Sequence, residues 1–264
     1  MEYSLIRGVP DFTAQVFRPQ RSKYCLCIPV INEGNRIQAE LKRAFDAGID
    51  KIVDIIICDG GSTDGSLSEE ILESLGVQSL LIKRGPGKQG AQLRMGFWFA
   101  LNQDYSGILT IDGNNKDSIE SVPKFIEKLE EGYDFVQGSR YLQGGEAVNT
   151  PLIRHLAVTF IHAPIITLTA KHKFTDTTNA FRGYSRKYLT HASVQPLRDI
   201  FVTYELLAYL SVRASQLGMK VTEVPVSRVY PAKGKTPTKI SFFKGNGGLL
   251  KILFLNLLGR YKPL

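Results

Sequence analysis

Five of the seven residues 52–58 are isoleucine or valine, and a cluster of turn-forming residues, 59–65, follows them at once. Continuous β-branched residues without polar alternation are typical of a strand that is buried on both faces of a sheet. Such a strand has to be covered by helices on both sides. The run therefore favours an α/β fold with a parallel sheet.

Strand-like and helical patterns alternate along the first 141 residues. Apolar runs predict strands at Tyr24–Val30 and at residues 52–58, 77–82, 107–111 and 135–137, with helical segments between most of them. This alternation predicts a mostly parallel sheet with right-handed crossovers. After residue 141 we expect helices over residues 152–169 and 202–217, a loop over 173–183 and a strand over 220–226.

The net charge of +8 is concentrated at the C-terminal end. Residues 220–264 contain nine basic residues and one acidic residue, so the rest of the chain is neutral. A basic block of this kind favours an anionic partner, either phospholipid headgroups or a phosphorylated ligand. Because no nucleic-acid-binding module is recognisable, we expect no nucleic-acid partner.

Residues 249–258 form an apolar run of about half the ~20 residues that a membrane-spanning helix needs. We expect this run to lie in a membrane interface, which predicts a peripheral protein. Alternatively it packs on the protein itself or on a second subunit, which leaves a homo-oligomer open. Cys25, Cys27 and Cys58 lie inside apolar runs and are interpreted as buried thiols of a cytoplasmic protein.

Polar residues follow the predicted strands where these end. They are Asn32 and Glu33, Asp59, the loop 85–88, which ends at Lys88, and residues 112–114. In open α/β sheets, ligands bind beyond the carboxyl ends of the strands. These positions predict a binding cleft, and each of them is also compatible with an ordinary turn or cap.

Asp112 comes directly after a predicted strand, and Asn114 supplies a second oxygen two residues later. Carboxylate and amide oxygens, together with phosphate oxygens, are ligands of hard cations such as Mg²⁺ and Mn²⁺. An ion held here would bridge a diphosphate and neutralise a departing nucleotide. The pair therefore predicts a divalent metal as cofactor.

Several different short motifs follow one another through residues 24–245. They are residues 28–33, 59–65, 90–96, 112–114, 138–141, 176–184, 223–226 and 235–240. Their order and spacing resemble the family 2 glycosyltransferases, which have the GT-A fold. The motifs of the second half resemble the polyprenyl-phosphate sugar synthases, the dolichyl-phosphate mannose synthase group.

The resemblance implies a nucleoside-diphosphate sugar as donor and a polyprenyl phosphate as acceptor. The implied donor-binding residues are Pro29, Asn32, Glu33, Asp59, Lys88, Asp112 and Gly113, with the metal on Asp112 and Asn114. The implied acceptor-phosphate residues are Arg140, Arg154 and Lys239, and the catalytic residues are Asp112, Arg140 and Arg154.

The same resemblance divides the chain. An N-terminal extension, 1–23, precedes a GT-A domain, 24–241, which has a nucleotide-sugar half, 24–141, and an acceptor half, 142–241. A basic and apolar tail, 242–264, would meet the cytoplasmic face of a membrane.

Three positions depart from the family pattern. Asn114 stands where the family usually has the second Asp of its D-x-D motif, so the site has one negative charge fewer. Lys116 replaces a common Gln near the metal, with Asp117 as a candidate to compensate, and Gly60 replaces an acid that helps to recognise the base. These changes bear on metal affinity and on the choice of nucleobase.

The acceptor determines whether a base is needed. A hydroxyl needs a general base, whereas a phosphate monoester, with a second pKa of about 6, is already a nucleophilic dianion at neutral pH. Glu205 is the only plausible base in the acceptor half, and Asp176 is interpreted as either a loop cap or a substrate contact. We therefore expect inverting transfer to a polyprenyl phosphate. Transfer to a sugar hydroxyl of a cell-surface glycan, and a non-catalytic nucleotide-sugar-binding module, stay open.

Overall fold

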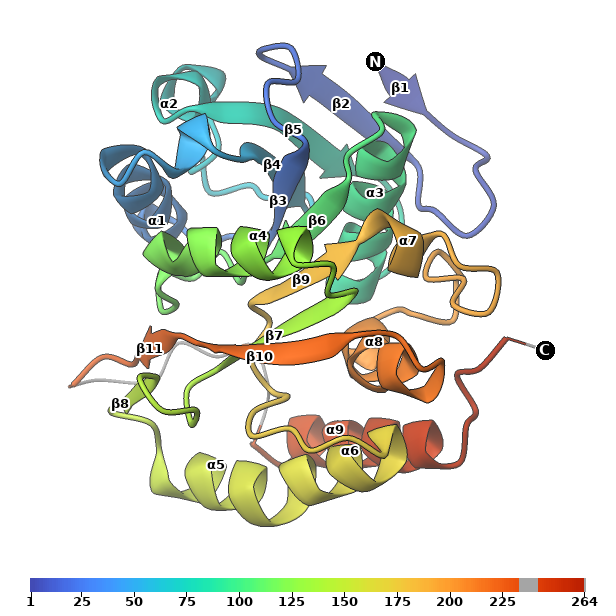
Figure 1. Cartoon of the computed structure of the whole chain (residues 1–264). Coiled ribbons are helices and arrows are strands. Elements are labelled where there is room, and N and C mark those ends of the chain that lie inside the picture. The colour runs from blue at the N-terminus through green and yellow to red at the C-terminus, as the bar shows by residue number, and fades with distance from the viewer. Residues whose placement is uncertain (233–241, 264) are drawn as a thin grey trace.

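The computed structural model describes residues 1–232 and 242–263, and a mixed nine-stranded sheet runs through it (Figure 1). In spatial order the strands are β1 (Glu2–Tyr3), β2 (Phe12–Val16), β5 (Val77–Lys83), β4 (Asp54–Asp59), β3 (Tyr24–Val30), β6 (Gly107–Thr110), β9 (Arg182–Ser185), β7 (Phe135–Ser139) and β10 (Val221–Pro225). A second sheet pairs β8 (Glu146–Val148) with β11 (Ser227–Val229). Residues 1–23 supply β1 and β2, so this segment extends the main sheet.

Helices cover both faces of the sheet, as the buried run at residues 52–58 requires. One face carries α1 (Asn35–Asp46), α2 (Glu69–Ser74) and α4 (Val122–Glu130). The other carries α3 (Gln89–Asn102), the short α7 (Arg186–Leu189) and α8 (Glu205–Gln216). Side chains alternate along β3, so Leu26 packs under the first group and Cys27 under the second.

The strands β5, β4, β3 and β6 are parallel to one another, which confirms the mostly parallel sheet. The elements predicted after residue 141 were incomplete, because β9 begins within the predicted loop at residues 173–183 and lies antiparallel between β6 and β7. Its first residue, Arg182, is buried and donates to the carbonyl oxygens of Thr177 (2.8 Å) and Asn179 (3.0 Å). A strand that begins on a buried arginine lacks the apolar run by which the other strands were recognised.

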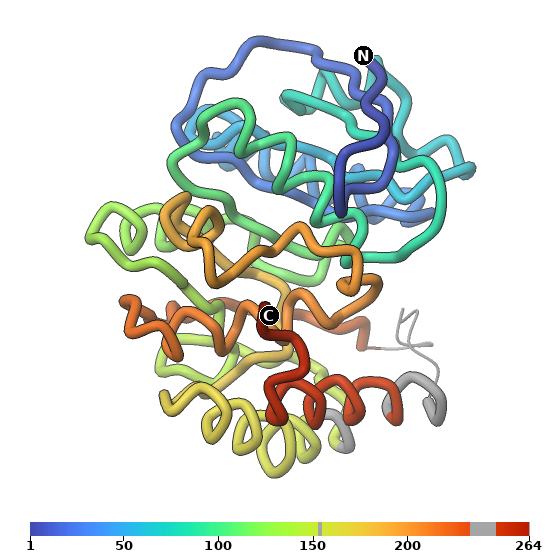
Figure 2. Tube along the Cα trace, turned by 90° about the vertical axis from the view of Figure 1, so that its right-hand side faces the viewer, coloured from blue at the N-terminus to red at the C-terminus, as the bar shows by residue number. Residues whose placement is uncertain are grey.

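A further helical layer lies below β10 in Figure 1. It consists of α5 (Leu152–Ala157), a π-helical turn (Val158–His162), α6 (Ala163–Ala170) and α9 (Phe242–Leu257), and α9 runs beside α6 in Figure 2. One face of α9 packs on the protein: Ile252 and Leu253 are buried, and Asn256 Nδ2 donates to the oxygen of Ala208 (2.8 Å). Within the described residues, no helix is long and apolar enough to span a bilayer.

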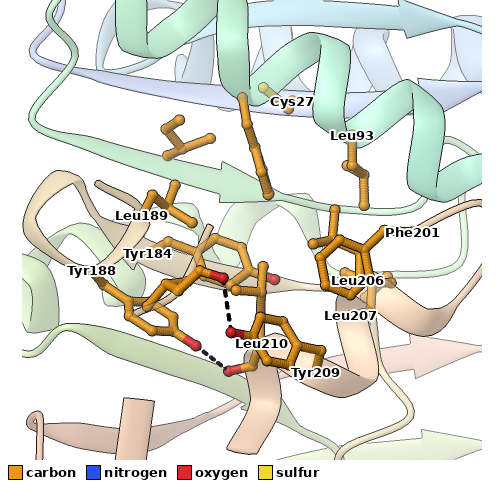
Figure 3. Packing of buried hydrophobic residues seen from close by; sticks show 14 of the residues in the cluster. Cys27, Leu93, Tyr184, Tyr188, Leu189, Phe201, Leu206, Leu207, Tyr209 and Leu210 are labelled. Atoms are coloured by element: carbon orange, nitrogen blue, oxygen red, sulfur yellow. Dashed lines mark hydrogen bonds between the residues drawn. The ribbon is translucent and has the colours of Figure 1, made fainter. Parts of the chain in front are cut away.

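Buried side chains of α3, α7 and α8 form a core cluster on one face of the sheet (Figure 3). Tyr188 Oη donates to the oxygen of Leu210 (2.7 Å), which ties α7 to α8. On α3, a Cβ at Gly96 would lie 2.5 Å from the Sγ of Cys58 and 3.2 Å from that of Cys27. All three cysteines are buried and unpaired, and they act as small side chains that let α3 approach the strands closely.

Candidate active site

Hydrogen bonds join the loops after β3 and β4, and they involve residues that were predicted to bind the nucleotide sugar. Asn32 Oδ1 accepts from the Thr63 N–H (2.8 Å), and the Asn32 N–H donates to Ser62 Oγ (3.0 Å). The buried Asp59 accepts from the N–H (3.0 Å) and the hydroxyl (2.6 Å) of Ser62. Asp59 therefore stabilises the turn, and its contact with a nucleoside stays a prediction.

The other predicted donor residues surround these loops. Pro29 is the penultimate residue of β3, and Glu33 forms an ion pair with Arg36 (2.7 Å). Lys88 directly precedes α3 and has an exposed side chain. Gln92 was not predicted: its buried Nε2 donates to the oxygens of Val30 (2.6 Å) and Cys58 (2.8 Å) and so holds the ends of β3 and β4 together.

Asp112 lies two residues beyond β6, at the same edge of the sheet. Its Oδ1 accepts from Gln89 Nε2 (3.0 Å), and its Oδ2 accepts from Arg228 Nη2 (3.2 Å). The segment runs close against β3, because a Cβ at Gly113 would lie 2.9 Å from a methyl of Val30. Both carboxylate oxygens of Asp112 are thus directed by side chains from separate elements.

Arg228, in β11, was counted in the sequence only as part of the basic C-terminal block. Its guanidinium also donates from Nη1 to Asp117 Oδ2, and Asp117 is completely buried. Burial acts to lower the pKa of Arg228, but the charges of Asp117 and Asp112 outweigh it and hold that pKa well above its ordinary value. Asp117 Oδ2 is taken up by this pair, whereas Asp117 Oδ1 is buried without a hydrogen-bond partner among the described residues, so its role in place of the missing second acid stays a prediction.

The oxygens at this edge fit a divalent ion of the Mg²⁺ or Mn²⁺ class. Asn114 Nδ2 donates to Asp112 Oδ2 (3.4 Å), whereas Asn114 Oδ1 is buried and has no hydrogen-bond partner among the described residues. The loop is held from below by Glu40, whose Oε2 accepts from the Asn115 N–H (2.7 Å). Burial raises the pKa of Glu40 well above its usual range. The described part of the chain contains no cluster of three or more His, Cys, Asp or Glu side chains around one point.

A pocket of about 440 Å³ opens beside Asn114. Its wall includes Arg36, Asn115, Lys116 and Tyr230. The Lys116 Nζ lies 5.2 Å from the centre of the Tyr230 ring, and burial, followed by the nearby Arg228 charge, lowers the pKa of Lys116. A larger hollow, about 660 Å³, lies away from this edge and is lined by Glu127, Glu130 and Glu131, whose charges disfavour a phosphorylated ligand.

Arg140, directly after β7, is held by Asp176. Nε donates to Asp176 Oδ2 (2.7 Å) and Nη2 to Oδ1 (3.0 Å), and Nη2 also donates to Thr178 Oγ1 (2.6 Å). Asp176 accepts from Arg140 and from the N–H (3.1 Å) and hydroxyl (3.0 Å) of Thr178, which favours the interpretation of Asp176 as a residue that holds its loop and positions Arg140. The guanidinium carbon of Arg228 lies 5.6 Å from the centre of the Tyr230 ring, and the charge of Arg140 acts to lower the pKa of Asp117, the partner of Arg228.

The remaining predicted residues are less well defined. Arg154 belongs to α5, but its side chain lies outside the described part, as does Lys239 altogether. Glu205 is the first residue of α8, where its carboxylate accepts from the N–H (2.5 Å) and the hydroxyl (2.8 Å) of Thr203. Both of its oxygens therefore serve the start of the helix.

Comparisons with known proteins identify the family of the chain. The model of the family described as Glycosyl transferase family 2 matches residues 25–191, more than half of the chain. Glycosyltransferase AglJ of Haloferax volcanii is 26% identical over 92% of this chain and 74% of its own. The undecaprenyl-phosphate mannosyltransferase of Micrococcus luteus is 24% identical over 87% of this chain and 90% of its own.

Among solved structures, glucosyl-3-phosphoglycerate synthase from Mycobacterium tuberculosis, in complex with Mn²⁺, UDP and phosphoglyceric acid, superposes with a TM-score of 0.63. It is 18% identical, with 90% of this chain and 78% of that chain covered, and it confirms the GT-A-like α/β fold. The resemblance to polyprenyl-phosphate sugar synthases is confirmed by relatives of that kind. The chain belongs to glycosyl transferase family 2 and is a glycosyltransferase.

Proposed function

We propose that this enzyme moves one sugar, with inversion, from a nucleoside-diphosphate sugar to a polyprenyl phosphate at the cytoplasmic face of a membrane. Relatives described as undecaprenyl-phosphate mannosyltransferase and polyprenol monophosphomannose synthase support the acceptor class. The solved relative that holds UDP and Mn²⁺ supports the donor class.

The pre-oriented guanidinium of Arg140 is the observation that carries the proposal. Two hydrogen bonds to Asp176 orient the Arg140 guanidinium before any substrate binds. A fixed guanidinium suits a phosphate dianion, which needs orientation and charge neutralisation and no general base. Glu205, the one candidate base, has both oxygens engaged by Thr203, and this favours phosphate over a sugar hydroxyl as acceptor.

Asp112 and Asn114 would hold a divalent ion through the Asp112 carboxylate and the unpartnered Asn114 Oδ1. When bound, such an ion neutralises the charge that develops on a departing nucleoside diphosphate. The chain's own part is to orient Asp112 through Gln89 and to place Lys116 in the wall of the adjacent pocket.

Membrane binding is supported by the outer surface of the helical layer. Exposed apolar side chains occur on residues 152–168 and on residues 250–258. They are Leu152, Phe160, Leu168, Leu250, Phe254 and Leu258. Residues 147–175 and 224–264, which build most of this layer, contain no acidic residue. An apolar surface with cations and no acids matches an anionic bilayer, where each basic residue contributes about 1 kcal/mol.

A donor screen followed by a transfer assay tests the proposal. Nucleoside diphosphates and their sugars, with and without Mn²⁺, would be compared by thermal shift, because a bound ligand raises the melting temperature by mass action. The sugar nucleotide that stabilises the protein should then label a short polyprenyl phosphate. Stabilisation by a donor without transfer to any phosphate or hydroxyl acceptor would instead indicate a binding module.

A further inference from the structure

The Asp112 carboxylate, which is expected to hold the metal, is already paired with the guanidinium of Arg228. Arg228 Nη2 donates to Asp112 Oδ2 (3.2 Å), and Nη1 of the same guanidinium donates to Asp117. Arg228 is only 7% exposed. One buried guanidinium therefore spans two carboxylates, of which Asp112 is partly exposed and Asp117 is completely buried.

The backbone gives Arg228 little freedom to move as a whole. On one side of it, the Val229 N–H donates to the oxygen of Lys116 (2.8 Å). On the other, the Ser118 N–H donates to the oxygen of Ser227 (2.9 Å), and the Ser227 N–H donates to Ser118 Oγ (3.0 Å). Backbone hydrogen bonds thus join β11 to residues 116–118 on both sides of Arg228. We therefore expect a change of hydrogen-bond partner at Arg228 to involve its side chain and not its backbone.

The charges disfavour a divalent ion that arrives alone. With Asn in place of a second Asp at 114, Asp112 is the one charged oxygen ligand, and Arg228 already neutralises it. Two like charges a few ångströms apart repel strongly in a partly buried site. A diphosphate changes this balance, because it brings negative charge and oxygen pairs that match a guanidinium fork.

We propose that Arg228 is a positioning residue that makes binding of the divalent ion depend on the donor diphosphate. Without donor it holds Asp112. When a diphosphate enters, the guanidinium turns to the phosphate oxygens while Asp117 keeps its other arm, and Asp112 is released to the ion. This rests on the proposed donor class, and by thermodynamic linkage the ion and the diphosphate strengthen each other's binding equally.

The test measures binding of two probes to the intact protein. Binding of Mn²⁺ alone is followed by electron paramagnetic resonance, and binding of the preformed Mn²⁺–pyrophosphate complex by calorimetry. In Arg228→Gln we expect Mn²⁺ alone to bind about tenfold more tightly and the complex about tenfold more weakly, within the usual range of such couplings. A purely structural role would weaken both.

Two further variants complete the design. Arg228→Gln leaves Asp117 buried without its cation, so Arg228→Gln with Asp117→Asn keeps that pair neutral and should show the same opposite shifts if the single variant fails to fold. Arg213→Gln is the matched control, because Arg213 lies on α8 and donates to the oxygen of Ser193 (3.0 Å), and both affinities should stay unchanged.

Unchanged affinities in the Arg228 variants, a parallel loss of both, or no Mn²⁺ binding under any condition would overturn the inference. Its failure is distinguishable from failure of the proposed function. Opposite shifts in a protein that transfers no sugar support the role of Arg228 alone, and sugar transfer with unshifted affinities contradicts that role alone.

Discussion

Arg140 and Asp176 form a bidentate ion pair with side chains that are 2% and 0% exposed. The pair connects the end of β7 to the loop before β9, and it places a cation of the acceptor half in one fixed orientation. A guanidinium held in this way is both a structural element and a candidate ligand for phosphate. Variants of Arg140 therefore have to be judged by stability as well as by activity.

We expect Arg140→Ala to lower the free energy of unfolding by about 3–5 kcal/mol, because it leaves the buried Asp176 carboxylate without its partner. Urea unfolding of the wild type and of Arg140→Ala measures this difference. Adding Asp176→Asn should restore part of the loss, since the amide removes the unpaired charge. A stability of Arg140→Ala equal to that of the wild type would show that the pair is not formed in solution.

The same pair predicts a pH dependence. Burial acts to raise the pKa of Asp176, but Arg140 outweighs it, so the folded-state pKa lies below the unfolded value of about 4. The stabilisation is therefore complete above that value and is lost as the pH falls through the folded-state pKa. As the pH falls below about 4, urea midpoints of the wild type should fall more steeply than those of Asp176→Asn. Parallel curves would contradict the shift.

Substitutions of Asp112 and Asn114 should change metal binding and sugar transfer without changing the fold. We expect Asp112→Ala to lose transfer while circular dichroism stays that of the wild type, because Asp112 is partly exposed at the cleft. Asn114→Asp restores a second acid beside it and should raise the affinity for Mn²⁺ by roughly tenfold, since carboxylates are stronger ligands than amides for hard cations. Transfer that proceeds undiminished in excess chelator would refute the metal role.

The helical layer should govern binding to vesicles. Phe254→Glu on α9 and Phe160→Glu in the π-helical turn each place a charge on the exposed apolar surface, and we expect both to weaken sedimentation with anionic liposomes. Binding of the wild type should weaken as salt increases. Phe45→Glu is the control, because Phe45 is an exposed phenylalanine of α1, outside the helical layer. An equal effect of all three substitutions would reject this surface as the membrane face.

Elements with strong apolar patterns could be predicted from the sequence. The strands β3, β4, β5 and β6 each contain a short apolar run, and their order along the chain implied the sheet edge where Asn32, Asp59 and Asp112 are found. Strand β9 could not be recognised in the same way, since its residues Arg-Gly-Tyr-Ser carry no apolar alternation and its place in the sheet depends on partners about fifty to eighty residues away.

The candidate site was predictable only where a residue follows a strand. Asp112 and Arg140 are of this kind. Arg228 was missed, because its significance comes from Asp112 and Asp117, more than 100 residues earlier in the chain, and a basic residue in a basic segment gives no local signal. Gln92 was missed for a similar reason, although a glutamine on an otherwise apolar helix face is a signal that points to a buried hydrogen-bond role.

The central claim, that the acceptor is a phosphate, is tested most directly by one transfer assay. A labelled sugar nucleotide is offered to a short polyprenyl phosphate and to the corresponding polyprenol, with the wild type, Arg140→Lys, Arg154→Ala and Glu205→Gln side by side. We predict labelling of the phosphate alone, loss of at least about tenfold in kcat/KM in the arginine variants, where the guanidinium fork is lost, and activity retained in Glu205→Gln. Transfer to a hydroxyl acceptor that depends on Glu205 and not on the arginines would contradict the account.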